Sequence, residues 1–174
     1  MADVVDAATR SRMMAGIRGK DTKPEILLRK ALFARGFRYR LHAGDLPGRP
    51  DLVLPRYRAA LFVHGCFWHM HGCDLFRLPS TRREFWRQKL AGNRERDARQ
   101  RAALRDAGWR VMVVWECAFK RAPAERINEV ADLVAGWLRS SESPPCVSIA
   151  LEGGKPALFV EDQRVGDEAG ERTV

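Results

Sequence analysis

The sequence lacks any uncharged apolar run long enough to cross a bilayer, and it contains no internal repeat. Its N-terminus, M-A-D-V-V-D, has acidic residues where a signal peptide needs a basic start followed by an apolar stretch. These absences argue against a membrane protein and predict that the chain stays in the cytoplasm. The 174 residues have the composition of one soluble globular domain.

Cysteine and histidine are scarce, with four of each, and most of them lie in one segment. Residues 62–73 read F-V-H-G-C-F-W-H-M-H-G-C and hold three of the histidines and two of the cysteines. In a reducing compartment, cysteines beside histidines favour metal ligation over disulfides. Both side chains bind zinc, and histidine transfers protons near neutral pH, so this segment predicts a metal site, an active site, or both.

Basic residues exceed acidic ones, and the excess is unevenly distributed. The formal net charge is +9, of which residues 1–139 carry +13 and residues 140–174 carry −4. A charge of this size attracts a polyanion, and nucleic acid is the commonest one in the cytoplasm. A surface kept soluble by arginine is the alternative explanation.

Hydrophobic periodicity and turn residues predict a mixed β-sheet flanked by helices in a single α/β domain. Asp21 or Thr22 is expected to cap the first helix, and Thr81 with Glu84 fits a capping box that opens the second. We expect helices at 21–36, 81–108 and 124–138 and strands at 37–42, 51–54, 59–63 and 109–115.

Three regions are predicted along the chain. Residues 1–20 carry many basic residues without a sustained apolar stripe, which predicts a basic N-terminal arm that orders on binding. Residues 21–139 form the folded domain. Residues 140–174 begin with S-S-E-S-P-P and are expected to be an acidic, flexible C-terminal extension, in which Cys146 is incidental.

Four residues have the spacing of a structural zinc site, which needs a tetrahedron of soft or borderline ligands from more than one element. Cys66, His71 and Cys73 form the pattern C-x4-H-x-C, and Cys117 follows an apolar strand. The set predicts a structural Zn²⁺ ion. Small buried thiols are the alternative, because free cysteine is often buried.

A second candidate site begins at L-P-G-R-P-D, where Asp51 opens one short strand and His64 closes the next. Phosphodiester hydrolysis with Mg²⁺ needs a hard oxygen ligand at a strand end, a second oxygen nearby and a group that activates water. Asp51 can supply the first oxygen and the backbone carbonyl of Val63 the second. Taken alone, an aspartate after proline is more often a turn residue.

His64 and His69 remain after zinc has taken its four ligands, and a histidine pair near an aspartate suits general acid–base chemistry. Asp97 is a candidate for fixing the tautomer of the base, although each histidine can also be a polar loop residue. One face of the second helix combines an aromatic ring, a cation, an amide and an acid, which fits a nucleic-acid surface near a catalytic centre: Trp86, Lys89, Asn93 and Asp97. Phe67 and Trp68 are candidate wedges between bases, or else ordinary packing residues.

Taken in order, the motifs L-P-G-R-P-D, H-G-C-F-W-H-x-H-x-C, T-R-x-E-F-W, N-x-E-R-D and G-W-R-V-x-V-V-W-E-C resemble the very-short-patch mismatch repair endonucleases. The resemblance covers residues 1–120 and implies a restriction-endonuclease-like fold. It implies an enzyme that nicks one DNA strand, 5′ to the thymine of a T·G mismatch left when 5-methylcytosine deaminates. Such enzymes accompany a cytosine-5 DNA methyltransferase.

The resemblance also implies roles for individual positions. Asp51 would bind Mg²⁺ together with the carbonyl of Val63, which stands where threonine is familiar in the family. His69 would be the general base paired with Asp97, while His64 and Glu25 would hold the hydrated metal ions and the scissile phosphate. Zinc would bind the four ligands named above. The DNA would be contacted by Phe67, Trp68, Trp86, Lys89, Asn93 and, from the minor groove, Met14.

The resemblance has one departure and leaves alternatives open. Restriction-type sites usually carry an acid and a lysine on the second strand, which here ends in F-V-H. A restriction-like nuclease that cuts both strands and a non-catalytic, zinc-stabilised DNA-binding module are the alternatives. A nicking enzyme needs no two-fold symmetry, so a monomer is expected, with other mismatch repair proteins as possible partners.

Overall fold

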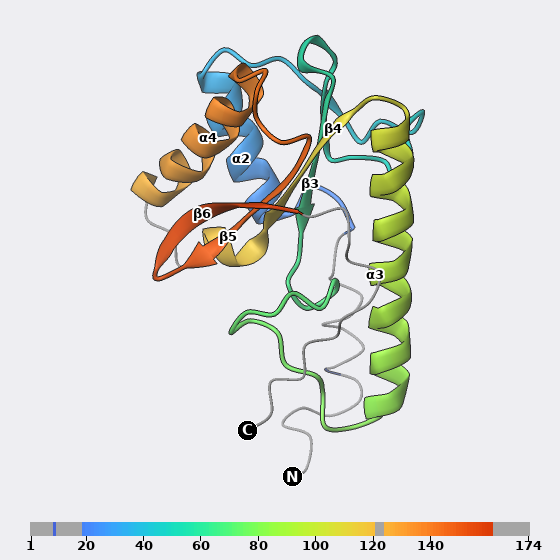
Figure 1. The fold of residues 1–174 in the computed structure, drawn as a ribbon. Helices are drawn as coiled ribbons and strands as arrows, with labels where there is room; N and C mark the ends of the chain where they lie inside the picture. The colour runs from blue at the N-terminus through green and yellow to red at the C-terminus, as the bar shows by residue number, and fades with distance from the viewer. Residues whose placement is uncertain (1–8, 10–18, 121–123, 162–174) are drawn as a thin grey trace.

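The computed structural model describes residue 9, residues 19–120 and residues 124–161. Its centre is a six-stranded sheet in the order β1-β2-β3-β4-β5-β6, flanked by helices (Figure 1). The strands are β1 (Arg40–Leu41), β2 (Leu52–Leu54), β3 (Ala59–His64), β4 (Arg110–Trp115), β5 (Cys146–Glu152) and β6 (Lys155–Val160). The helical elements are α2 (Lys23–Ala34), η1 (Pro55–Tyr57), α3 (Arg83–Asp106), η2 (Glu116–Phe119) and α4 (Ala124–Arg139).

The sheet is mixed, as the sequence predicts. The central strands β3, β4 and β5 are parallel, whereas β1, β2 and β6 pair antiparallel with their neighbours. Helix α3 connects β3 to β4, and α4 connects β4 to β5, because parallel neighbours need a crossover connection. This arrangement confirms the expected mixed sheet with flanking helices.

Side chains of the central strands alternate between two cores on opposite faces of the sheet. Leu61 and Met112 belong to the core that α2 and α4 cover. Ala60 and Val111 belong to the other core, which Leu104 of α3 helps to form. The sheet is therefore buried on both sides, and α3 lies on the face opposite α2 and α4.

Two element boundaries differ from the predictions. Residues 37–42 form a strand only at Arg40–Leu41, because β2, its partner, has just three residues. Helix α3 begins at Arg83 with Arg82 as its N-cap, one residue after the expected cap at Thr81. Glu84 accepts hydrogen bonds from Arg87 and Gln88 along the first turns of the helix. At the start of α2, Thr22 is the N-cap and forms the capping box with Glu25.

The prediction of a flexible C-terminal extension is wrong for residues 146–160, which form β5 and β6. Strand β5 continues the sheet beside β4, and Gly153 and Gly154 turn the chain into β6 with positive φ angles of 55° and 81°. Cys146 opens β5 and is buried. Pairing with β4 and burial of alternate apolar side chains stabilise this hairpin despite its acidic flanks. The predicted arm and residues 162–174 lie almost wholly outside the described residues.

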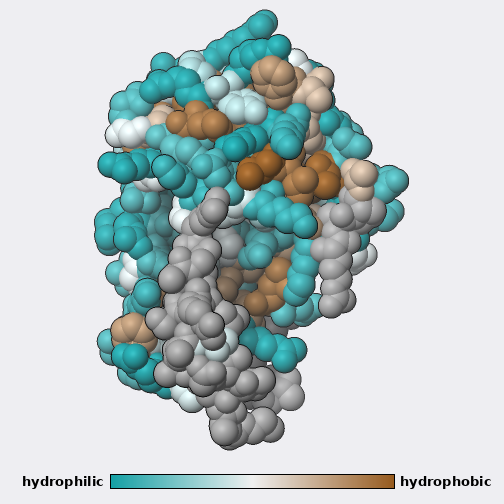
Figure 2. Space-filling model, turned by 180° about the vertical axis from the view of Figure 1, so that it is seen from behind, coloured by the Kyte–Doolittle hydropathy of each residue, from teal (hydrophilic) through white to brown (hydrophobic). Residues whose placement is uncertain are grey.

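Helix α3 extends well beyond one end of the sheet (Figure 1). Figure 1 shows its N-terminal half running beyond the sheet, beside the loop of residues 65–82 that follows β3. Seen from behind, the surface is mostly hydrophilic, with local hydrophobic patches (Figure 2). Among the described residues, no helix is long and apolar enough to span a membrane.

Substitution of Ile149 by alanine tests whether β5 belongs to the core. Ile149 is 0% exposed, so its truncation should lower the free energy of unfolding by about 2–5 kcal/mol. Val160→Ala is the matched control in β6, since Val160 is 62% exposed and should cost far less. Urea unfolding of both variants measures the difference, and equal, small effects would contradict the placement of β5.

Candidate active site and metal centre

The start of β2 and the end of β3 lie side by side because these strands are antiparallel. Leu52 pairs with Leu61, so Asp51, one residue before β2, lies next to the last residues of β3. Strand β3 ends at His64, and the loop after it carries the cysteines, histidines and aromatic residues. The predicted site residues therefore gather at one edge of the sheet and on the adjoining half of α3.

Asp51 is held by the strand beside it. Its Oδ2 accepts a hydrogen bond of 2.7 Å from the Val63 N–H. Burial raises the pKa of Asp51 to about 6; the Val63 hydrogen bond opposes this increase, and the negative charge of Glu25 adds to it. A carboxylate that is destabilised in this way gains from a cation placed beside it.

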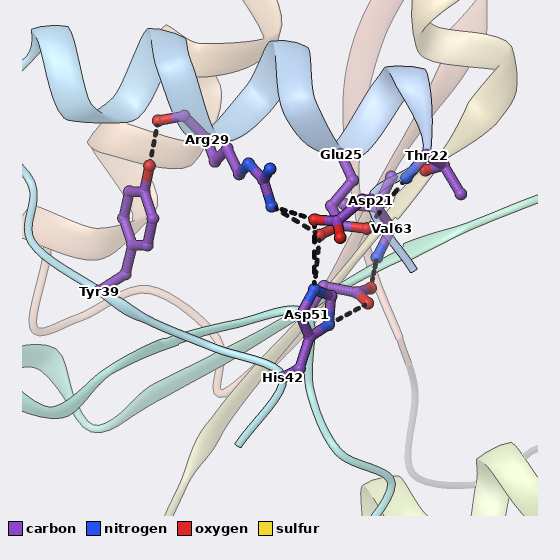
Figure 3. Close-up of polar contacts among 8 residues, drawn as sticks. All are labelled: Asp21, Thr22, Glu25, Arg29, Tyr39, His42, Asp51 and Val63. Carbon is purple, nitrogen blue, oxygen red and sulfur yellow. Dashed lines mark hydrogen bonds and ion pairs between the residues drawn. The ribbon is translucent and has the colours of Figure 1, made fainter. Parts of the chain in front are cut away.

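Glu25 and His42 join Asp51 in a polar cluster at the N-terminal end of α2 (Figure 3). Glu25 is 1% exposed and accepts a hydrogen bond from the Thr22 N–H, while Arg29 contacts it from the same helix. The His42 ring lies 3.2 Å from Glu25 and 3.8 Å from Asp51. The structure thus brings Glu25, which the sequence connects to the site only through a resemblance, into the surroundings of Asp51.

His69 and Asp97 form the predicted pair across the loop and α3. The Nδ1 atom of His69 is hydrogen-bonded to Asp97 Oδ2, which leaves Nε2 available to accept a proton. The ring of His64 stacks on that of His69 at 3.8 Å between centroids, with only 4° between their planes. Burial lowers the pKa of His64 well below its usual range, and His69 and Arg101 add to the decrease.

The cysteine-rich set also comes together. The possible ligand atoms of Cys66, His71, Cys73 and Cys117 all lie within 4.8 Å of one another, so the group can hold a metal ion. His71 Nδ1 is 3.5 Å from the Cys66 sulfur and 3.7 Å from the Cys117 sulfur. Its ring stacks on Trp115 at 4.2 Å, which fixes its orientation.

Proton sharing between two of the thiols fits a metal centre. The hydrogen bond between Cys66 and Cys117 raises the pKa of the Cys66 thiol and lowers that of Cys117. A lowered pKa favours the thiolate form of Cys117, and the thiolate is the form of cysteine that binds metal ions. Leu151 and Phe159 of the C-terminal hairpin pack beside these cysteines.

The candidate wedge residues Phe67 and Trp68 form one aromatic cluster with Trp86, between the loop and α3. Phe67 contacts Trp68 and Trp86 edge-on at 5.1 and 5.5 Å between ring centroids. All three rings are half-buried, so each keeps part of its surface free for a ligand. Lys89 is exposed, and its ammonium group lies 5.3 Å from the Trp86 ring and 5.6 Å from that of Trp68.

Asn93, another predicted DNA contact, makes two hydrogen bonds within the protein. Its Nδ2 atom donates a hydrogen bond of 3.0 Å to the Trp68 carbonyl, and its Oδ1 accepts one from Arg96. In this structure the amide therefore holds the loop against α3. Met14, the remaining predicted DNA contact, lies outside the described residues.

His42 is the site residue that sequence reasoning missed. It is the one histidine outside residues 62–73 and matches none of the quoted motifs. A signal was available, because His42 ends the predicted strand at 37–42 and lies four residues before L-P-G-R-P-D. Its proximity to Glu25, however, depends on how α2 packs against the sheet.

Comparison with known proteins identifies relatives over most of the chain. The sequence profile of DNA mismatch endonuclease Vsr matches residues 2–75. The DNA mismatch endonuclease Vsr of Escherichia coli (strain K12) is 50% identical over 136 residues, which covers 74% of this chain and 87% of that protein.

Two further relatives are type II nicking enzymes. V.XorIIP of Xanthomonas oryzae pv. oryzae is 50% identical over 117 residues, covering 67% of this chain and 86% of the relative. V.NmeAIP of Neisseria meningitidis serogroup A is 42% identical over 132 residues, covering 75% and 94%. The identity over most of both chains confirms the resemblance read from the motifs, and this chain belongs to the Vsr family of DNA mismatch endonucleases.

Proposed function

We propose that this protein is a magnesium-dependent endonuclease that nicks DNA 5′ to the thymine of a T·G mismatch, and so starts very-short-patch repair of deaminated 5-methylcytosine. The observation that carries the proposal is the His69–Asp97 pair, which lies at the same edge of the sheet as Asp51. One relative is named as a mismatch endonuclease and another as a nicking enzyme, which supports DNA nicking as the reaction class. The restriction-endonuclease-like fold belongs to the same proposal.

Asp51 and the Val63 carbonyl are the proposed magnesium ligands. In a β-strand, the N–H and C=O of one residue project from the same edge. The Val63 N–H points to Asp51, so its carbonyl oxygen also projects toward that side, beyond the last residue that β2 pairs. Two hard oxygens on one edge suit Mg²⁺, and a backbone ligand tolerates valine in place of threonine.

His69 is the proposed general base. With Nδ1 held by Asp97, its Nε2 would take a proton from the water that attacks the phosphorus atom. His64, buried and neutral, would fix the His69 ring by stacking and face the scissile phosphate, and Glu25 would bind water of the hydrated metal. Bound magnesium would supply Lewis-acid stabilisation of charge on the phosphate oxygens.

Zinc is the proposed occupant of the cysteine-rich set. Zinc lies about 2.3 Å from sulfur and about 2.0–2.1 Å from nitrogen, so a tetrahedron places these atoms roughly 3.6 Å apart. The measured separations of 3.5 and 3.7 Å between His71 and two sulfurs agree with that value. The ion would join the loop after β3 to η2 after β4 and so stiffen the loop that carries His69.

Phe67, Trp68 and Trp86 are proposed to wedge between bases from the major groove, with Lys89 beside the mismatched pair and Met14 in the minor groove. Their exposed ring surface supports stacking, and a wobble pair should lower the cost of opening the duplex. Asn93 would also approach the mismatched pair, and its hydrogen bond to the Trp68 carbonyl would hold that residue near the DNA. We further infer a monomer in the cytoplasm that works beside a cytosine-5 methyltransferase, and contact with other repair proteins.

Duplexes that differ in one base pair test this function. With Mg²⁺, the protein should nick the thymine-containing strand of a T·G duplex and leave the C·G duplex intact, across several flanking sequences. Denaturing gels with each strand labelled separately measure the products. Cleavage of both strands would favour a restriction-like nuclease, and binding without cleavage would favour a non-catalytic DNA-binding module.

Removal of the proposed base should abolish chemistry and spare binding. We expect His69→Ala and Asp97→Asn each to lower the single-turnover nicking rate by about 10²-fold or more, because each removes the oriented proton acceptor. Asp132→Asn, which breaks an exposed ion pair with Arg35, is the control and should keep the wild-type rate. A His69→Ala variant that folds, binds zinc and nicks at the wild-type rate would refute this role.

Two cysteine variants test the metal centre. Cys117→Ser should reduce bound zinc, measured by mass spectrometry of purified protein, from one ion per chain to a small fraction, with a lower melting temperature. Cys146→Ser is the matched control, since Cys146 is also buried but contacts Glu161 instead of the cluster. Retention of a full equivalent of zinc by Cys117→Ser would exclude this ligand set.

A further inference from the structure

His42 has an unusual backbone conformation beside the proposed magnesium ligand. Its φ angle is +47°, in the left-handed region that non-glycine residues seldom adopt. Its N–H donates a hydrogen bond of 3.2 Å to the Asp51 carbonyl oxygen, which continues the pairing of β1 with β2. A conformation of this kind persists where the surroundings hold it, and such residues concentrate at functional sites.

The conformation aims the imidazole between carboxylates from two separate elements (Figure 3). Nδ1 lies 3.8 Å from Asp51 Oδ1, at the start of β2. Nε2 lies 3.2 Å from Glu25 Oε1 and 3.6 Å from Asp21 Oδ1, at the N-terminal end of α2. The ring therefore bridges the helix and the sheet at the point where both contribute acids to the site.

We infer that His42 is a positioning residue, which holds Glu25 and Asp51 at a fixed separation for the catalytic metal ion and its water. This inference rests on the proposed function. The two carboxylates repel each other and belong to elements that can shift independently. Contacts from one ring to both acids oppose that shift and order the acids before the metal binds, as outer-shell partners of metal sites commonly do.

His42 is better placed to position the acids than to bind a metal ion itself. With Asp21 and Glu25 it forms a group compact enough to hold an ion. Arg29 already contacts these acids, at 2.7 Å from Asp21 Oδ1 and 3.3 Å from Glu25 Oε1. A divalent ion bound to the same oxygens would face the guanidinium charge at short range, whereas a bridging imidazole is compatible with it.

Glycine at position 42 separates the ring from the backbone. His42→Gly keeps the left-handed conformation without steric cost, so it removes the imidazole and leaves the chain path unstrained. Tyr39→Phe is the matched control, because it removes a 2.7 Å hydrogen bond to the Arg29 carbonyl in the same region without touching either carboxylate. Asp51→Ala defines the loss of the metal ligand.

Binding of Mn²⁺ to the zinc-loaded full chain, measured by electron paramagnetic resonance without DNA, is the first readout. His42→Gly should weaken the Asp51-dependent binding by about tenfold or more, and Tyr39→Phe should not change it. In nicking assays, His42→Gly should raise the Mg²⁺ concentration needed for half-maximal rate and recover most of the rate at saturating Mg²⁺.

The outcomes separate this role from the proposed function. If Mn²⁺ binding depends on Asp51 but the Mn²⁺ affinity of His42→Gly is within twofold of wild type, the role of His42 alone is overturned. Equal Mn²⁺ binding by wild type and Asp51→Ala would overturn the metal site at Asp51 and the role of His42 with it. Mismatch selectivity is measured independently, on T·G and C·G duplexes.

Discussion

The antiparallel alignment of β2 with β3 is the constraint on which the site depends. It puts Asp51 beside the unpaired end of β3, where the Val63 N–H fixes the carboxylate and the Val63 carbonyl projects toward the same side. The proposed metal ligands, the stacked histidines and the start of the loop after β3 all lie at that edge. A shift of one residue in this register would turn Val63 away from Asp51, because alternate residues of a strand project from opposite edges.

The cysteine-rich set connects the loop after β3 to η2, and the proposed metal ion would fix this connection. Cys66, His71 and Cys73 lie within this loop, and Cys117 lies in η2 after the neighbouring parallel strand. On the α3 side, His69 contacts Asp97 and Asn93 contacts the Trp68 carbonyl. The imidazoles and the aromatic cluster are thus fixed between two independent attachments, which a catalytic loop of this length needs if its side chains are to keep their relative positions.

Charge is balanced locally at the site although the chain is strongly basic. Asp51 and Glu25 are largely buried, and their mutual repulsion is offset by Arg29 and by backbone N–H groups. Removal of water strengthens each of these contacts. Burial also destabilises the ionised carboxylates. A cation beside them would relieve this destabilisation, which favours binding of the metal ion that the proposed reaction requires.

Local sequence determined the elements and most of the chemistry. Periodicity and capping residues predicted α2, β3, β4 and α4, and ligand spacing predicted the set that includes Cys66 and Cys117, because these signals depend on near neighbours. Tertiary structure decided the rest. Residues 146–160 become strands through pairing with β4, although the Gly153-Gly154 turn between two short runs was a usable hairpin signal. His42 lies beside Glu25 only because α2 packs on the sheet at this point, and no motif in the sequence links these two residues.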